Sequence, residues 1–523
     1  MVENSVASDK LRQAVTFAVS SGYQLDQEAF NILQVLSKTT DVGKIIKRAI
    51  DQANMLPERP LFITRQLIED AARELLPEKE ATKPLPPVLT GKGIFHPYAK
   101  EVKSNIKIVE DPTATVSSTG NIDDFLQCFR DRFLRIEKLL RQRLDARDAV
   151  PLRVALEAPP NTELKTIGIV TEKRERKRRV FMQIEDLEVT ATIIVPPTAE
   201  ATVIEKAQKI LLDQVICINA RRGNNDILIA IDFIWPDLPD RKPNPATENI
   251  AVALTSDLHV GSKTFLRETF NRVILWLNGK TGNGAQRELA GRVKYFIIAG
   301  DLVDGIGVYP EQERELIIHD IYEQYRVAAQ FIEQIPDYIE VILIPGNHDA
   351  TRQALPQPAI PRKYAEPIYE MRRVIMLGDP AKVVLHGVSI LLYHGRSLED
   401  VIGSIPNLTY RHPEKAMELL LRSRHLAPVY GKRTPIAPEP KDYLVIDDSP
   451  DIFHSGHVHI NGYTSYRGVL IVNSGAWQSQ TSYQRKMGLE PTPGKMPIVD
   501  LQKLHLTEMN FTSTEDLALT HGQ

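Results

Sequence analysis

The sequence YFIIAGDLVDG at residues 295–305 places a run of apolar residues directly before a glycine turn that carries two aspartates. The sequence VILIPGNHD at residues 341–349 repeats this design, with asparagine, histidine and aspartate after the turn. A short apolar run that ends at a glycine turn is typical of a buried strand. From Asn249 onward such strands alternate with helical segments, which predicts an α/β layered fold for this part of the chain.

Three further segments share the design of an apolar strand followed by a turn with polar residues. They are residues 250–259, which end in Asp257-Leu258-His259, residues 390–395, which end in His394-Gly395, and residues 451–459, which end in Gly456-His457-Val458-His459. Ligand-binding residues of an open α/β sheet collect beyond the carboxyl ends of its strands. One such motif alone is a weak signal, but five of them in order, each after a predicted strand, favour a common metal site.

The five motifs resemble those of the calcineurin-like metallophosphoesterases: Asp-x-His, Gly-Asp-x-x-Asp, Gly-Asn-His-Asp, His-Gly and Gly-His-x-His. The resemblance implies a C-terminal α/β/β/α layered phosphoesterase domain, which we expect over residues 245–510. It also implies two divalent metal ions, the first bound by Asp257, His259, Asp301 and His459 and the second by Asp301, Asn347, His394 and His457. A bridging carboxylate such as Asp301 holds two cations about 3.5–4 Å apart.

The chemistry of these ligands narrows the choice of metal. Imidazole and oxygen ligands suit Mn²⁺, Fe²⁺ or Zn²⁺ better than Ca²⁺. The resemblance to the nuclease branch of the superfamily favours Mn²⁺, and Mg²⁺ stays open.

His348 and Asp304 are the residues to which the resemblance gives catalytic roles. In the superfamily, the histidine of the Gly-Asn-His-Asp motif faces the phosphate and protonates the leaving oxygen or stabilises its charge. The matching aspartate orients that imidazole, so Asp304 is expected to act on His348; the alternative is that Asp304 only shapes the turn before Gly305. Five further histidines match no motif and are expected to be structural or at the surface: His319, His386, His412, His425 and His454.

The sequence upstream of this domain divides into three parts. Residues 1–78 carry apolar residues at helical spacing and predict a small helical interaction domain. Residues 79–120 are rich in proline and polar residues and predict a flexible linker. Residues 121–244 predict a leading helix and five short strands, with a helix between the third and fourth, an order that matches an OB-fold barrel. Residues 511–523 are expected to form a C-terminal tail.

Charge and cysteine content bound the possible partners and location. The net charge of the 523 residues is only −3, so any contact with nucleic acid must come from local patches. One candidate patch is the run from Lys173 to Arg179 between the first two barrel strands, which could bind phosphates or simply form a solvated turn. Cys128 and Cys217 fit neither a metal nor a disulfide spacing, which favours a reducing cytoplasm. No apolar stretch reaches the roughly 20 residues of a membrane-spanning helix, so no membrane partner is expected.

A second and more specific resemblance involves the residues after the last metal motif. The sequences VNSGAWQSQT at 472–481, QRKMG at 484–488 and PTPG at 491–494 closely resemble the small subunits of archaeal family D DNA polymerases. The resemblance covers roughly residues 125–505. It implies a 3′-to-5′ exonuclease for single-stranded or mismatched DNA ends, a heterodimer with a large catalytic polymerase subunit, and a cytoplasmic location at the nucleoid. No convincing motif for a sliding clamp is visible.

Two other functions stay open at this point. Related non-catalytic subunits of eukaryotic replicative polymerases share this architecture without the metal ligands, so the chain could be an assembly subunit with a structural metal site. It could also be a stand-alone phosphodiesterase or phosphatase. Protein phosphatases of this fold follow the bridging motif with Arg-Gly, whereas this chain has Asp304-Gly305-Ile306-Gly307, which weakens the phosphatase interpretation.

Overall fold

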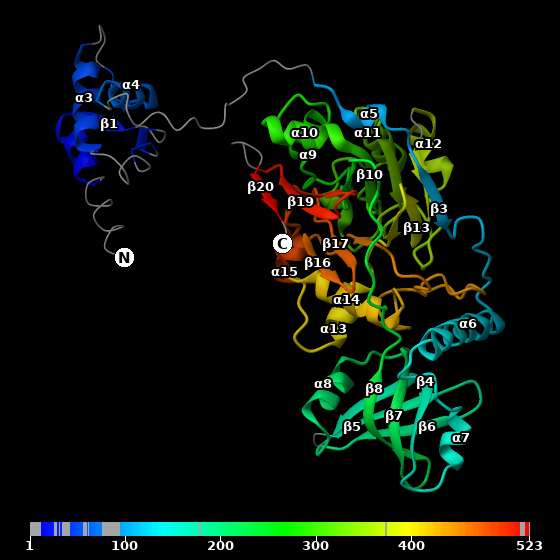
Figure 1. The fold of residues 1–523 in the computed structure, drawn as a ribbon. Helices are drawn as coiled ribbons and strands as arrows, with labels where there is room; N and C mark the ends of the chain where they lie inside the picture. The colour runs from blue at the N-terminus through cyan, green and yellow to red at the C-terminus, as the bar shows by residue number, and fades with distance from the viewer. Residues whose placement is uncertain are drawn as a thin grey trace. The chain divides into compact units, whose positions relative to one another are not determined.

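The computed structural model describes residues 12–25, 29–30, 32–33, 42–55, 60, 62–75, 95–176, 179–371, 374–512 and 518–521. The chain forms two compact units, residues 1–92 and residues 93–523 (Figure 1). None of the helices in the described residues is long and apolar enough to cross a membrane.

The first unit is a small helical body with one short sheet. Residues 12–20 are helical, and they are followed by β1 (Gln24–Leu25), α3 (Val42–Asn54), β2 (Phe62–Ile63) and α4 (Arg65–Leu75). Small and branched side chains at helical spacing form its core, among them Ala14, Ala18, Ile46 and Ala49. The helices match the expectation for this region, whereas the parallel pair β1–β2 was not predicted.

One part of the second unit is a closed five-stranded barrel. Its strands are β4 (Glu163–Arg176), β5 (Arg179–Glu185), β6 (Thr190–Val195), β7 (Val215–Arg222) and β8 (Ile227–Ile234), in the order β4-β5-β6-β8-β7. Alternate side chains fill the interior, including Met182, Ile193 and Ile218. The five predicted strands are therefore confirmed, as is the helix α8 (Ala201–Lys209) between the third and fourth.

Two helices flank the barrel, α6 (Ile122–Arg141) and α7 (Leu152–Glu157). Asn121 starts α6 with a capping box, because its side chain accepts from the backbone N–H of Asp124 while Asp124 accepts in return. Phe133, Ile136 and Leu140 of α6 pack against the barrel residues around Ile167 and Cys217. The predicted leading helix is thus an integral part of the barrel's outer layer.

The rest of the second unit is built on two facing mixed sheets. The seven-stranded sheet has the order β12-β11-β10-β9-β18-β19-β20, and the six-stranded sheet has the order β16-β17-β15-β14-β13-β3. The strands of the first sheet are β9 (Ala251–Thr255), β10 (Val293–Ala299), β11 (Glu340–Ile344), β12 (Val374–Met376), β18 (Lys495–Asp500), β19 (His505–Asn510) and β20 (Ala518–His521). Those of the second are β3 (Ile106–Glu110), β13 (Ala381–Leu385), β14 (Val388–Leu392), β15 (Ile452–Ser455), β16 (Gly462–Tyr466) and β17 (Val469–Asn473).

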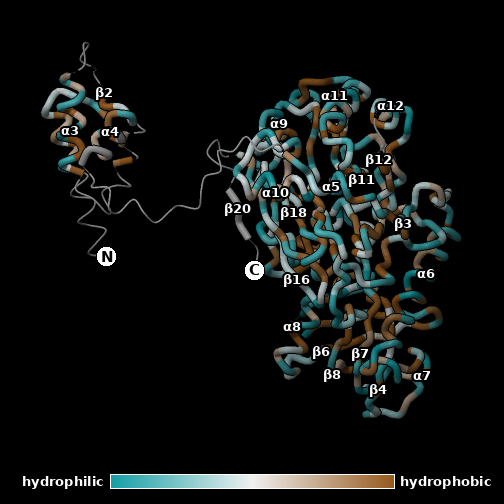
Figure 2. Tube along the Cα trace, turned by 45° about the horizontal axis from the view of Figure 1, so that its top comes forward, coloured by the Kyte–Doolittle hydropathy of each residue, from teal (hydrophilic) through white to brown (hydrophobic). Residues whose placement is uncertain are grey.

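Helices cover the outer face of each sheet and so complete four layers. α9 (Arg267–Leu277), α10 (Gly284–Arg292), α11 (Ile321–Glu333) and α12 (Arg362–Met371) share one core with β9, β10 and β11. α13 (Leu398–Ser404) and α14 (Pro413–Ser423) share another with the six-stranded sheet. The strands alternate between the two cores, since Phe296 and Ile298 face the helices while Tyr295 and Ile297 face the other sheet. Figure 2 shows the hydrophobic residues gathered along these interior strands.

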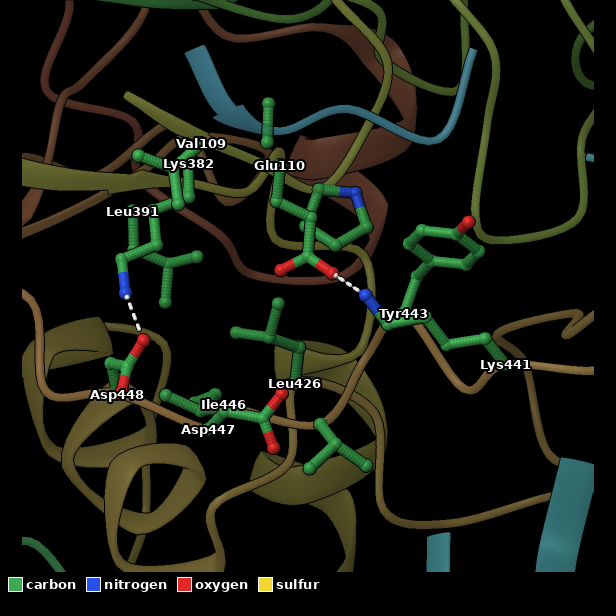
Figure 3. A pocket seen from close by; sticks show the side chains of 13 residues that line it. Val109, Glu110, Lys382, Leu391, Leu426, Lys441, Tyr443, Ile446, Asp447 and Asp448 are labelled. Atoms are coloured by element: carbon green, nitrogen blue, oxygen red, sulfur yellow. Dashed lines mark hydrogen bonds and ion pairs between the residues drawn. The ribbon is translucent and has the colours of Figure 1, made fainter. Parts of the chain in front are cut away.

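The expectation of a flexible linker over residues 79–120 is wrong for its second half. α5 (Tyr98–Glu101) and β3 lie within that range, and β3 pairs antiparallel with β13 as the edge strand of the six-stranded sheet. Figure 3 shows Glu110 of β3 paired with Lys441 at a cavity of about 200 Å³, beside the ion pair of Lys382 with Asp448. Residues 76–94 lie outside the described residues.

The predicted C-terminal tail over residues 511–523 is likewise corrected in part. Phe511 is fully buried in the core beneath the helices, and β20 extends the seven-stranded sheet by pairing with β19. The short sequence of β20 lacks the apolar alternation of an independent strand, so its register depends on β19.

Candidate metal centre

Five strands end at one edge of the two sheets and bring the sequence motifs together. β9, β10 and β11 are parallel neighbours in one sheet, and β14 and β15 are parallel neighbours in the other. Their carboxyl ends therefore lie at the same edge, where the polar residues follow two to four positions after each strand. The residues gathered there are Asp257, His259, Asp301, Asn347, His348, His394, His457 and His459.

Two neighbouring clusters form from these side chains. Asp257, His259 and His459 place ligand atoms within 4.8 Å of one another, and Asp301, His394 and His457 do the same. The carboxylate oxygen Oδ2 of Asp301 lies 3.3 Å from Nε2 of His394 and 3.8 Å from Nε2 of His259, which belongs to the other cluster. Asp301 thus stands between the clusters, as expected for a bridging carboxylate.

Asn347 completes the second cluster. Its Oδ1 lies 3.1 Å from Nε2 of His394. The structure therefore brings together every residue that the sequence assigned to the two metals.

Unusual backbone conformation marks the same residues. Asp257, His259, Asp301, His457 and His459 all have positive φ angles, between 53° and 70°. Residues with a Cβ atom avoid this region, and they are found there where the surrounding structure enforces it, often at functional sites. The turns after the strands are therefore shaped to aim these side chains.

Hydrogen bonds fix two of the imidazoles in the tautomer that a metal requires. Nδ1 of His394 donates to the backbone carbonyl of Ala299 at 2.8 Å, and Nδ1 of His259 donates to Oδ1 of Asp304 at 3.0 Å. In the neutral form of both rings, which is the form that binds a metal, Nε2 carries no proton and faces the cluster. Histidine ligands of metals are held by outer partners of this kind.

The donor set fits a cation. Oδ1 of Asp257 is fully buried and has no hydrogen-bond partner in the described residues, although Nε2 of His459 lies 3.5 Å away. The Nε2 atoms of His259 and His459 face each other at 3.0 Å. A divalent ion would satisfy both the buried carboxylate oxygen that lacks a hydrogen bond and the two imidazole nitrogens that face each other.

The electrostatics of the bridging acid and its histidine neighbour agree with this fit. Burial acts to raise the pKa of Asp301, but the charges of His394 and His348 outweigh it, and the pKa lies far below its usual range. Burial acts to lower the pKa of His394, but Asp301 raises it to about 10. In the metal-free chain the imidazoles thus supply the positive charge that bound cations would supply instead.

The structure corrects the expectation for Asp304 in part, because its carboxylate acts on His348 only through its charge, which raises the pKa of that imidazole against the effect of burial. Its carboxylate bonds to His259, and Gln312 and Gln478 donate to the same carboxylate at 3.0 and 3.2 Å. His348 instead donates its Nδ1–H to the backbone carbonyl of Asp304, at 2.7 Å. Since that carbonyl is present in any residue, the side chain of Asp304 orients a predicted metal ligand and its main chain orients His348.

His348 lies beside the two ligand clusters and forms a third group with His259 and Asp304, whose ligand atoms also lie within 4.8 Å of one another. Its ring is 4.6 Å from that of His259 and 6.1 Å from that of Tyr309, and burial lowers its pKa. It lines a cleft of about 450 Å³ together with residues of both clusters. The cleft is also lined by polar side chains outside the five metal motifs, among them Tyr309, Gln353, Arg396, Glu399, Tyr410, Arg433, Gln478, Tyr483 and Gln484.

Two of these additional residues contact predicted ligands. Oε1 of Glu399 lies 3.6 Å from Nε2 of His457, and Nε2 of Gln484 lies 3.0 Å from Nδ1 of His459. Gln484 had a usable signal, because Thr481-x-x-Gln484 is a capping-box sequence. Glu399, at the start of α13, had no such signal.

The remaining histidines agree with the structural roles expected of them where contacts are seen. Nε2 of His454 lies 2.8 Å from Oγ of Ser474 within the core, and burial lowers its pKa to about 3. His425 bonds to Asp442, and His386 to Glu248. None of these takes part in the two clusters.

Two facing sheets with a cluster of histidine and aspartate at their strand ends place this protein in the metallophosphoesterase class. Residues 252–460 match the family of the B subunits of DNA polymerases alpha and epsilon. Three relatives called DNA polymerase II small subunit are similar over most of the chain. The relative from Archaeoglobus fulgidus is 38% identical, and the match covers 91% of this chain and 93% of the relative. Those from Methanocaldococcus jannaschii (43% identical, covering 78% of this chain and 68% of the relative) and Halobacterium salinarum (34% identical, covering 94% of this chain and 97% of the relative) agree. The chain belongs to the family of DNA polymerase II small subunits. A solved archaeal phosphodiesterase matches 50% of this chain and 98% of its own, at 14% identity and a TM-score of 0.25.

Proposed function

We propose that this chain is a two-metal 3′-to-5′ exonuclease that removes nucleotides from single-stranded or mismatched DNA ends. The observation that carries the proposal is the pair of ligand clusters joined by Asp301 in an open cleft. Asp257, His259, Asp301 and His459 would hold one metal, and Asp301, Asn347, His394 and His457 the other. We favour Mn²⁺, with Fe²⁺, Zn²⁺ and Mg²⁺ as alternatives.

Bound metals would supply Lewis-acid stabilisation of a phosphoryl group and of an attacking water. The chain's own residues do the rest. His348 lies at the cleft with its Nδ1–H donating to the carbonyl of Asp304, and we assign its Nε2, in the protonated ring, the role of proton or hydrogen-bond donor to the leaving oxygen. Arg396 and Arg433 line the same cleft and can bind phosphates along an incoming strand.

Family membership supports the partners that we propose. The relatives are named as small subunits, so we infer a large catalytic polymerase subunit as the partner of this chain, in a heterodimer or higher assembly. The barrel, whose strand order is that of an OB-fold, would serve as a docking platform in this assembly. We place the complex in the cytoplasm at the nucleoid, and a sliding clamp stays an unsupported partner.

The test is digestion of end-labelled single-stranded DNA in the presence of Mn²⁺. We expect stepwise loss of nucleotides from the 3′ end by the wild-type chain, and loss of this activity in Asp301→Asn and His348→Ala. If the chain is silent both alone and with its large subunit, while it still binds the metal, it is a non-catalytic assembly subunit. Hydrolysis of phosphoproteins or cyclic nucleotides without any digestion of DNA would overturn the proposal in favour of a stand-alone enzyme.

A further inference from the structure

We propose that the outer face of the barrel hairpin β4–β5, together with β6, binds single-stranded DNA at a site separate from the metal centre. We call this surface the hairpin face and define it by Arg174, Arg176, Phe181, Gln183 and Thr192. This surface would add a DNA-binding site to the proposed nuclease. The inference rests on the proposed function only in naming DNA as the single strand that is bound.

The first observation is a local concentration of positive charge. Residues 172–179 contain six cationic side chains and two acidic ones, in a chain whose net charge is −3. Phosphate affinity depends on where cations gather and not on the charge of the whole chain. The hairpin can therefore attract a nucleic-acid strand even though the net charge of the whole chain is negative.

The second observation is how the strands sort these side chains. Arg174 stands directly opposite Phe181 across the hairpin, and Arg176 stands opposite Arg179. Side chains at every second position share a face, so Arg174 and Arg176 project together on the outside of the barrel. Gln183 and Thr192 are also cross-strand partners, which extends the same face onto β6.

The third observation is a shallow hollow on this face. It has a volume of about 310 Å³ and is lined by Glu172, Arg174, Arg176, Phe181, Met182, Gln183 and Thr192. Phe181 is half-buried and lines the hollow together with Arg174 and Arg176. An aromatic ring flanked by cations is the arrangement on which a base stacks while its phosphates are bound.

The remaining contacts leave the arginines available. Among the residues that the structure describes, Arg176 has no carboxylate within ion-pair distance, and Arg174 pairs only with the exposed Glu172. Lys173 points the other way, and its Nζ donates to the backbone carbonyls of Gln208 and Ile210, both at 2.8 Å. This lysine ties the hairpin to the end of α8, so the outer face is held in place before any strand binds.

Single-stranded DNA suits this face better than a duplex. Stacking on Phe181 needs a base whose flat side is exposed, and a duplex buries that side between neighbouring pairs. Gln183 and Thr192 can form hydrogen bonds with any base, so we expect little sequence preference.

The test is binding of a labelled oligothymidylate of about 16 nucleotides to the full chain, a length that one small barrel can cover. EDTA keeps the metal centre empty and the DNA intact. The site variants are Arg174→Gln with Arg176→Gln, and separately Phe181→Leu. The matched control, Arg130→Gln with Arg153→Gln, removes the same charge from exposed positions on α6 and α7.

We expect the double site variant to weaken binding about tenfold and to reduce the slope of log affinity against log salt by about 1.4, since each phosphate contact on a single strand contributes about 0.7. Phe181→Leu should weaken binding about fivefold or more, with the slope unchanged. The control should change neither. Equal effects of site and control variants, or none, would overturn the proposal. Hydrolysis of bis(p-nitrophenyl) phosphate with Mn²⁺ reports on the metal centre separately and should be the same in all variants.

Discussion

Gly346 has no side chain, and the carboxylate of Asp301 occupies the space where one would lie. A Cβ atom at Gly346 would be 2.1 Å from Oδ1 of Asp301, and a Cβ at Gly456 would be 2.4 Å from Oδ2 of Asp257. Glycine is therefore needed at positions 346 and 456, because the carboxylates of Asp301 and Asp257 from two other motifs pack against them. At the scale of single residues, the motifs are parts of one packing arrangement.

Gly346→Ala is therefore expected to displace Asp301 and to lower Mn²⁺-dependent hydrolysis about 100-fold, the loss that a shift of roughly 1 Å in a catalytic group causes. The backbone at Gly346 does not require positive φ, so the fold should persist. Gly403→Ala is the control, because a Cβ at Gly403 meets nothing within 4 Å. Steady-state hydrolysis and the midpoint of thermal unfolding check both variants; unchanged activity in Gly346→Ala would contradict the packing described.

Among the elements, the short helix α15 (Ser482–Lys486) has two functions at once. Oε1 of Gln484 accepts from the backbone N–H of Thr481, which caps the helix, and Nε2 of the same side chain bonds to His459. The helix start is therefore coupled to the orientation of a predicted metal ligand.

Gln484→Ala should lower stability by about 1 kcal/mol through loss of the cap and weaken Mn²⁺ binding about 10- to 100-fold through His459. Gln286→Ala is a matched control, since Gln286 holds the same position in the capping box of α10 and is not among the residues that line the cleft with the predicted ligands. We expect both variants to unfold at a lower temperature, but only Gln484→Ala to need more Mn²⁺ for half-maximal hydrolysis. If both variants needed the same Mn²⁺ concentration for half-maximal hydrolysis, the proposed coupling between α15 and the metal centre would be wrong.

The strands that carry the metal motifs could be predicted from the sequence, because each is a continuous apolar run before a glycine turn. The edge strand β3 could not be predicted, since its sequence IKIVE follows a proline-rich stretch and its partner β13 lies far along the chain. The group of polar residues that gathers at the strand ends could likewise be predicted from motif order. The partner of the Asp304 carboxylate could not, because the choice between His259 and His348 depends on a turn geometry that spacing does not determine.

At the scale of the whole second unit, a buried cluster of Arg132, His425 and Asp442 joins α6 to the body of the two sheets. Arg132 and His425 both bond to Oδ2 of Asp442, at 2.8 and 2.9 Å. Nδ1 of His425 accepts from the backbone N–H of Ala427 at 3.1 Å, so this imidazole is neutral. Burial, together with the charge of Arg132, lowers the pKa of His425 to about 4.

This cluster predicts a stability that falls in mild acid. The pKa of His425 is lower in the folded chain than its usual 6.5, so the unfolded chain binds more protons between pH 6.5 and about 4. The stability due to neutral His425 is therefore present above pH 6.5 and is lost as the pH falls, by about 3 kcal/mol in total. His425→Asn should be less stable at pH 7 but should change less with pH than wild type, whereas the exposed control His412→Asn should follow wild type. Thermal unfolding in EDTA across this range checks the difference; parallel curves for wild type and His425→Asn would contradict it.

The most direct test of the metal centre is the number of Mn²⁺ ions that the chain binds. Titration calorimetry measures this number in the wild-type chain and in the variants Asp301→Asn and His394→Ala. We expect two sites in the wild-type chain, weakening of both in Asp301→Asn, and weakening of only one in His394→Ala. Asp301 stands between the clusters, whereas His394 belongs to one of them. A single site in the wild-type chain, or a loss of only one site in Asp301→Asn, would contradict a centre that shares this carboxylate.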